Sequence, residues 1–226
     1  MIQSAKSYVD QLRELLLGVD ASAIDLLTDL VFRSWLEDRQ VIAFGNGGSA
    51  YTASHFVTDL VKTAAAKGQR HLRAISLLDN MGLVTAVAND IGYDQFLCYQ
   101  LESYGRPGDL AVAISGSGSS PNVVRACRWA SDNGLTVVAI TGFDGGKITE
   151  MCDLHINVPS ENYGLIEDIH LAIGHMTSQA LKARIAIEHL STRFKQKPRG
   201  RPVSESQSKF PSALPTGRRP GAAADG

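Results

Sequence analysis

The feature that most constrains the fold is an alternation of short apolar runs with longer helical patterns across residues 39–192. Helical patterns lie near 49–67, 80–103 and 120–133, and a longer one lies near 163–190. Strands that are apolar along nearly their whole length are buried on both faces, as in a parallel sheet covered by helices. We therefore predict an α/β fold, a three-layer αβα sandwich. Its five-stranded parallel sheet is expected to contain Val41–Gly45, Leu72–Ser76, Leu110–Ser115, Thr136–Ile140 and Leu154–Val158.

The two ends of the chain differ from this central domain. Residues 1–38 show helical spacing of apolar side chains with a break near Gly18, which predicts two amphipathic helices that pack on the domain or on a neighbouring subunit. Residues 193–226 are rich in proline, glycine, serine and arginine. We predict a disordered basic tail there, because the segment has too little apolar surface to offset the entropy of ordering.

Composition excludes several classes of protein. The 226 residues are 44% hydrophobic and 20% charged with a net charge of −1, so the core offers no electrostatic reason to bind nucleic acid or a membrane. The three cysteines are odd in number and widely spaced, which argues against a disulfide framework or a cysteine zinc site. With no signal-peptide pattern and no apolar run of membrane-spanning length, we expect a cytoplasmic protein.

Two turns rich in glycine and serine each follow a predicted strand and open a predicted helix. They are Gly45-Asn46-Gly47-Gly48-Ser49 and Ser115-Gly116-Ser117-Gly118-Ser119-Ser120. Small residues let the backbone approach a ligand, and a helix N-terminus supplies unpaired N–H groups that suit phosphate. In a parallel sheet both turns lie at the carboxyl edge, where such folds bind ligands. A flexible loop is the less favoured alternative for either turn alone, and the pair predicts a phosphate site.

The first turn also fits a dinucleotide-binding pattern, Gly45-x-Gly47-x-x-Ala50. That pattern needs an acid at the end of the second strand to hold the ribose. Residues 69–76 contain no acid, although Arg70 or Arg73 would suit a phosphorylated dinucleotide. No Gly-Lys-Ser/Thr sequence occurs, which excludes a Walker loop. A phosphorylated small molecule is therefore favoured.

Polar side chains on two predicted helices are candidates for proton transfer or metal binding. His55 and Asp59 are four residues apart and share a helix face. Glu167, His170 and His175 lie on the last helix, which is otherwise mostly apolar. Imidazole and carboxylate groups bind divalent metals and move protons between adjacent carbons. A surface ion pair accounts for the first two equally well, and a core or interface position accounts better for each histidine of the last helix.

Seven stretches together resemble the SIS (sugar isomerase) domain family, and within it the phosphoheptose isomerase branch, over residues 5–190. The resemblance implies the flavodoxin-like SIS fold and a homotetramer with active sites at subunit interfaces. It implies conversion of the phosphorylated sugar sedoheptulose 7-phosphate into D-glycero-D-manno-heptose 7-phosphate through an enediol, with one zinc ion per site. The stretches are Gly45–Ser49, His55-Phe56, Ala88–Tyr93, Gly105–Asp109, 115–120, Thr141–Gly146 and Glu167–His175.

The resemblance also assigns roles to individual positions. It implies substrate contacts at Asn46, Gly47, Gly48, Ser49, Asn89, Asp90, Ser115, Gly116, Ser117, Ser120 and Glu167. It implies zinc ligands at His55, Asp59, Glu167 and His175. Asp59 is expected to be the base and His175 its acid partner. Glu167 and His175 are about 12 Å apart along a straight helix, so they share one ion only if the helix is irregular or if neighbouring subunits complete the site.

This chain departs from the branch at three of these positions and at Ser119. Asp59 replaces the usual glutamate, Glu167 the usual glutamine, and Gly116 and Ser119 replace threonine and asparagine. These changes leave an isomerase of another ketose phosphate as an alternative. A non-catalytic tetrameric scaffold of the replication-initiator-associating type is a second alternative, although His55, Asp59 and His175 argue against it. A sugar-phosphate-sensing regulator is a third, but no helix-turn-helix segment accompanies the domain.

Overall fold

The computed structural model describes residues 4–196, and its five strands form one parallel sheet in the order β2-β1-β3-β4-β5. The chain moves outward from β1 to β2 and then returns to place β3 on the other side of β1. In open parallel sheets, ligands bind where the strand order reverses in this way. The strand prediction is confirmed, with every end within two residues of β1 Gln40–Phe44, β2 Arg73–Ser76, β3 Leu110–Ser115, β4 Thr136–Gly142 and β5 Leu154–Val158.

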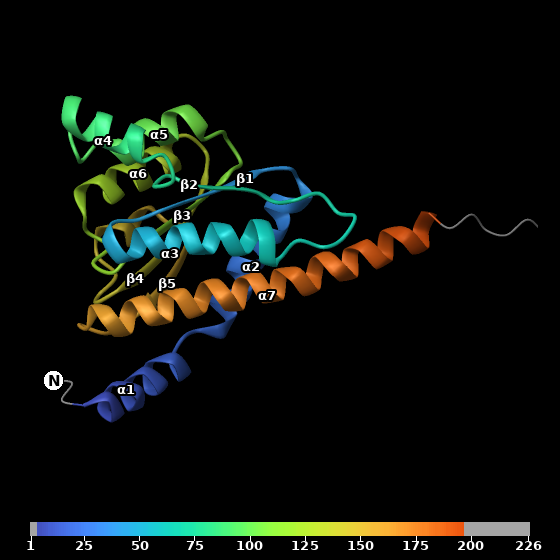
Figure 1. Ribbon diagram of the computed structural model, residues 1–226, viewed down its shortest axis with the longest axis horizontal. Helices are drawn as coiled ribbons and strands as arrows, with labels where there is room; N and C mark the ends of the chain where they lie inside the picture. The colour runs from blue at the N-terminus through green and yellow to red at the C-terminus, as the bar shows by residue number, and fades with distance from the viewer. Residues whose placement is uncertain (1–3, 197–226) are drawn as a thin grey trace, which may run out of the picture.

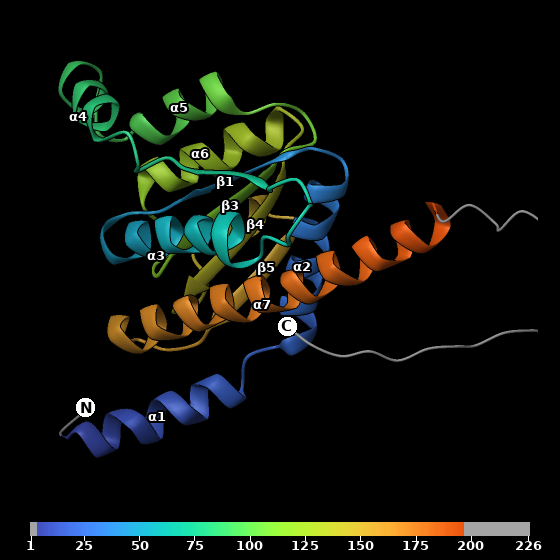
Figure 2. The ribbon, with the colours of Figure 1, turned by 45° about the vertical axis from the view of Figure 1, so that its right-hand side comes forward.

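Helices cover both faces of the sheet, so the predicted αβα sandwich is confirmed (Figure 1). One face carries α2, α3 and α7, and the other carries α4, α5 and α6 (Figure 2). The helices are α1 Ala5–Leu17, α2 Ala21–Leu36, α3 Gly47–Thr58, α4 Met81–Asp90, α5 Phe96–Tyr104, α6 Pro121–Asp132 and α7 Tyr163–Gln196. A π-helical turn, Asp59–Thr63, continues α3, and a 3-10 turn spans Lys147–Met151.

The layering follows from the alternation of side chains along each strand. In β1, Val41 and Ala43 pack with the α2, α3 and α7 layer, whereas Ile42 and Phe44 pack with the opposite layer. All four side chains are completely buried. A strand buried on both faces needs apolar residues at nearly every position, which is why the three central strands β1, β3 and β4 are nearly continuous apolar runs in the sequence.

Helix α1 is the least integrated element of the described chain. It has no buried residue and lies along α7 (Figures 1 and 2). Its Tyr8 hydroxyl donates a 2.6 Å hydrogen bond to Asp168 Oδ2. That bond and the nearby negative charge raise the pKa of Tyr8 to about 12. The expectation that the N-terminal helices pack on the domain or on a neighbouring subunit stays a prediction.

Three expectations need correction or lie outside the structure. The single helix near 80–103 is wrong, since residues 91–95 separate α4 from α5 and Gly92 adopts a φ of 145° that few other residues tolerate. Helix α7 continues to Gln196, past the boundary set at residue 193. The predicted disordered tail beyond it lies outside the described residues. Within residues 4–196, no helix is both long and apolar enough to cross a bilayer.

Candidate active site

The two glycine- and serine-rich turns are neighbours, because they follow the adjacent strands β1 and β3. Their contact is a reciprocal amide pair. Asn46 Nδ2 donates to Asn122 Oδ1 at 2.9 Å, and Asn122 Nδ2 donates to Asn46 Oδ1 at 2.8 Å. The Tyr93 hydroxyl, from the connection between α4 and α5, also donates to Asn46 Oδ1 at 3.2 Å. Asn46 therefore fixes the spacing of the two turns rather than capping α3 with its side chain.

The first turn places the start of α3 at the carboxyl edge of the sheet. Gly47 and Gly48 are exposed, and Ser49 is buried. The carboxylate of Glu167, from α7, packs against Gly48 so closely that a Cβ at this position would collide with it. The N-terminus of a helix favours a nearby negative charge. This corner therefore already holds a carboxylate from the protein itself.

The second turn places the start of α6 beside the first. Ser115 and Gly116 are buried, whereas Ser117 and Ser120 are partly exposed. Ser115 Oγ accepts a 3.1 Å hydrogen bond from the Gly118 N–H. Ser120 is the N-cap of α6 but does not use its hydroxyl as a cap, and Pro121 follows it. The Ser120 hydroxyl and the first N–H groups of α6 are thus available to an anion.

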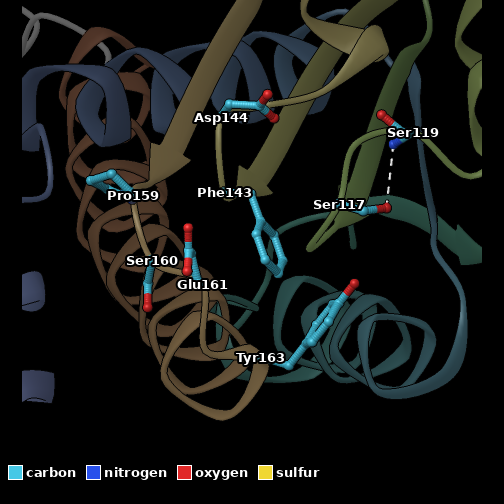
Figure 3. A pocket seen from close by; sticks show the side chains of 8 residues that line it. All are labelled: Ser117, Ser119, Phe143, Asp144, Pro159, Ser160, Glu161 and Tyr163. Carbon is cyan, nitrogen blue, oxygen red and sulfur yellow. Dashed lines mark hydrogen bonds between the residues drawn. The ribbon is translucent and has the colours of Figure 1, made fainter. Parts of the chain in front are cut away.

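A cavity of about 600 Å³ opens beside the second turn (Figure 3). Ser117 and Ser119 line it, together with residues 143–144 and 159–163. Residues 45–49 do not line this cavity. Within residues 4–196, the side chains of Asn46 and Asn122 join the two turns, but only the second turn lines this cavity.

Three of the four predicted metal ligands form a cluster where α3 packs on α7. Asp59 Oδ2 lies 3.7 Å from His55 Nε2 and 3.6 Å from His175 Nε2. The two imidazole Nε2 atoms are 3.2 Å apart. The Asp59 side chain is 14% exposed, whereas the imidazoles of His55 and His175 are 48% and 42% exposed. The cluster therefore forms a shallow surface site with a largely buried carboxylate at its base.

An irregularity in the helix begins at Asp59 and holds its carboxylate. At Asp59 the α-helical pattern gives way to a π-helical turn, closed by a 2.9 Å bond from the Ala64 N–H to the Asp59 carbonyl. Such turns are frequent at functional sites. The Thr63 hydroxyl donates to Asp59 Oδ1 at 2.8 Å, which leaves Oδ2 directed toward the imidazoles. Sequence spacing alone did not identify Thr63 or the π-turn.

The cluster's dimensions fit a divalent metal. All three ligand atoms lie within 4.8 Å of one another. Zinc bonds of about 2.0–2.1 Å place tetrahedral ligands roughly 3.3 Å apart, which is close to the separations of 3.2 to 3.7 Å seen here. The set also matches the imidazole and carboxylate donors that zinc accepts. Three ligands of this kind leave a coordination position open.

Three predicted site residues lie apart from this cluster. Glu167 contacts Gly48 instead and is not within the group of possible metal ligands. Asn89 and Asp90 are exposed at the end of α4, where Asn89 Nδ2 donates to Asp90 Oδ1. Because α4 covers the face of the sheet opposite α3 and α7 (Figures 1 and 2), a single chain does not bring them to the cluster. Their roles in the site stay predictions.

His170 is a core residue, which is the position that the sequence favoured for a histidine of this helix. It is 1% exposed, and its Nε2–H donates to the Thr141 carbonyl at 2.9 Å. Its Nδ1 has no hydrogen-bond partner among the described residues. Burial disfavours the charged imidazole and lowers the pKa of His170 to about 4.

This low pKa predicts a loss of stability in acid. The unfolded chain, with an ordinary histidine pKa near 6.5, takes up the proton first, so stability falls as the pH drops from about 6.5 to about 4. Between pH 7.5 and pH 5 we expect His170 to contribute a decrease of about 2 kcal/mol in the free energy of unfolding. Urea unfolding at both pH values would measure this in the wild type and in His170→Gln, which keeps an N–H donor. An equal pH dependence in the two proteins would contradict it.

The chain matches two overlapping family models that are both described as SIS domain, over residues 7–142 and 97–189. It is 40% identical to a phosphoheptose isomerase of Rhodospirillum rubrum over 160 residues, which cover 71% of this chain and 85% of the relative. It is 35% identical to a probable phosphoheptose isomerase of Thermoplasma acidophilum over 172 residues, which cover 76% of this chain and 94% of that one.

Solved structures agree with the sequence relatives. A phosphoheptose isomerase from Francisella tularensis superposes with a TM-score of 0.74 at 28% identity, covering 79% of this chain and 96% of that one. A phosphoheptose isomerase from Neisseria gonorrhoeae gives 0.73 at 29% identity with the same coverage. These matches show that the five-stranded parallel sheet and its flanking helices have a known architecture. The chain belongs to the SIS domain family and, within it, to the phosphoheptose isomerase branch.

Proposed function

We propose that this protein is an aldose–ketose isomerase that converts sedoheptulose 7-phosphate into D-glycero-D-manno-heptose 7-phosphate through an enediol. The observation that carries the proposal is that a single helix, α3, begins beside the serine turn at the carboxyl edge of the sheet and holds His55 and Asp59 farther along. Gly47 and His55 are about 12 Å apart along the helix axis. An extended seven-carbon chain with its phosphate is roughly 10 Å long on the scale of covalent bonds, so one substrate spans both features.

The residues of the cluster suit proton transfer between adjacent carbons. In our proposal, Asp59 Oδ2 takes the proton from C1 of the ketose and returns it to C2, because the carbonyl moves from C2 to C1. The His175 imidazole moves the hydroxyl proton between the two oxygens. Thr63 holds Asp59 Oδ1, which keeps the other carboxylate oxygen directed at the substrate. Geometry of this kind is the first requirement of a general base.

We propose zinc as the metal. His55, Asp59 and His175 are the residues that would hold it, and Asp59 and His175 would be free to move protons only when they are not coordinated to it. When bound, it would polarise the carbonyl oxygen and stabilise the negative charge of the enediolate. Glu167 stays a proposed fourth ligand or substrate contact. Its negative charge, where the branch usually has glutamine, favours a bound cation. Both imidazoles are nearly half exposed, which supports the proposal that neighbouring subunits of a homotetramer complete the site. The free thiols of all three cysteines support a reducing, cytoplasmic location.

Turnover of the purified protein tests this function. We expect sedoheptulose 7-phosphate to be converted into the aldose product, which nuclear magnetic resonance distinguishes from the ketose. A chelator should remove most of the activity, and added zinc should restore it. Conversion of a different ketose phosphate at a higher kcat/KM would replace the proposed substrate. A tetramer that binds no sugar phosphate and shows no turnover would favour the scaffold alternative.

A further inference from the structure

The cavity beside the second turn contains groups that proton transfer and metal binding do not use. Its volume of about 600 Å³ is in the range of small-molecule sites. In Figure 3, the rings of Phe143 and Tyr163 stand beside Ser117 and form an apolar wall. The other lining residues are Ser119, Asp144, Pro159, Ser160 and Glu161. Aromatic rings and carboxylates thus line a cavity beside the second turn, where we propose that the phosphate binds.

The aromatic pair is held in a fixed arrangement. The two ring centroids are 5.0 Å apart, and the rings meet edge to face at 63°. Phe143 has a φ of 50°, a left-handed conformation that is uncommon for a residue other than glycine. Its N–H donates to the Ser160 carbonyl at 3.1 Å, and its own carbonyl accepts a 3.2 Å bond from Asn157 Nδ2. Backbone conformations of this kind persist where the surroundings enforce them, and they cluster at ligand sites.

The aromatic pair also packs directly against the second turn, through Tyr163. A Cβ on Gly116 would lie 2.8 Å from Cε1 of Tyr163, so the ring occupies the space that any larger residue at 116 would need. The segment after Phe143 is joined to the same turn by two further bonds. The Ile148 N–H donates to the Gly118 carbonyl at 3.1 Å, and the Lys147 N–H donates to Ser119 Oγ at 3.3 Å. The wall and the turn are therefore joined by direct packing and by two hydrogen bonds.

The aromatic rings and carboxylates that line this cavity suit a carbon chain with several hydroxyl groups. Tyr163 is 55% exposed, and its hydroxyl has no hydrogen-bond partner in residues 4–196. A phosphate held by the second turn would lie close to the ring, so the carbons nearest the phosphate meet an apolar face. Asp144 and Glu161 accept hydrogen bonds from hydroxyl groups. Their charges disfavour a second anionic group in the same cavity.

We propose that Phe143, Tyr163, Asp144 and Glu161 form a subsite for the phosphate-proximal carbons and hydroxyls of the sugar. Tyr163 is its specificity-determining residue, since its ring contacts both the turn and the cavity. The subsite favours sugar phosphates over phosphate alone. The identity of the sugar rests on the proposed function, whereas the subsite itself rests on the geometry of the cavity.

Calorimetric titration of the full chain with sedoheptulose 7-phosphate and with inorganic phosphate tests the subsite. We expect Tyr163→Ala to raise the Kd of the sugar phosphate about tenfold, since tyrosine side chains often dominate contact energies. The Kd of inorganic phosphate should change less than about twofold, because the serine turn is intact. Tyr163→Phe should keep the preference for the sugar phosphate. Tyr99→Ala, which removes an exposed tyrosine of α5, is the matched control.

The two ligands respond differently only if Tyr163 contacts the sugar. Equal weakening of both ligands would overturn the subsite and assign Tyr163 to support of the turn. Unchanged binding would overturn it, and so would a change of oligomeric state in Tyr163→Ala, since the cavity would then be a subunit contact. Wild-type protein that binds sedoheptulose 7-phosphate tightly without converting it would refute the proposed reaction and leave the subsite standing. Wild-type protein that binds it no better than phosphate would refute both.

Discussion

Replacing Asp59 by asparagine is expected to lower kcat for isomerisation of sedoheptulose 7-phosphate by about 10³-fold, the loss typical of a missing general base. Asparagine has nearly the same shape, and its Oδ1 still accepts the hydrogen bond from Thr63. The change therefore removes the charge and the basicity while keeping the packing of the π-helical turn. Steady-state kinetics measure kcat and KM, and circular dichroism checks the fold.

Two further variants make this result specific. Asp25→Asn removes the same charge from an exposed position on α2, and its kcat should match the wild type. Asp59→Glu, which restores the residue usual in the branch, should recover part of the lost activity. Because Asp59 is also a proposed metal ligand, the zinc content of each variant must be measured. Activity of Asp59→Asn within tenfold of the wild type would remove Asp59 from the role of base.

Local patterns in the sequence were sufficient to predict the sheet and the paired turns. Most residues of each strand are apolar. In each of the two turns, the end of a strand, several small residues and the start of a helix follow one another within a few positions. The pairing of His55 with Asp59 was also visible, because four residues bring side chains to one helix face. These features depend on neighbours along the chain, which a sequence displays directly.

Features that depend on tertiary contact were not predictable in the same way. The reciprocal pair of Asn46 and Asn122 joins residues 76 positions apart, and no periodicity marks it. The π-turn at Asp59 shifts the helix register within a segment whose pattern predicts continuous helix. Glu167 shares a helix with His175, yet it contacts Gly48 rather than the cluster. Helix spacing indicated that separation, but only the packing of α7 on α3 shows where Glu167 goes.

Replacing Asn46 by aspartate is expected to raise the Kd of inorganic phosphate about a hundredfold. A carboxylate cannot donate, so the bond from position 46 to Asn122 Oδ1 is lost and two oxygens face each other. The new charge also stands at the start of α3 beside the Glu167 carboxylate. A like charge about 5 Å from a bound anion costs roughly 3 kcal/mol at an effective dielectric constant near 20. Isothermal titration with phosphate measures the change.

A variant of Asn122, the hydrogen-bond partner of Asn46, tests whether Asn46 positions the turns or contacts the substrate directly. Asn122→Asp disrupts the same amide pair from the other side, so it should weaken phosphate binding to a similar degree. Asn46→Ser loses the pair without adding a charge and should have a smaller effect, of about fivefold, since a lost hydrogen bond costs about 1 kcal/mol. Asn133→Asp adds the same charge at the opposite end of α6 and should leave binding unchanged. If Asn122→Asp binds phosphate like the wild type, the amide pair does not set the spacing of the turns.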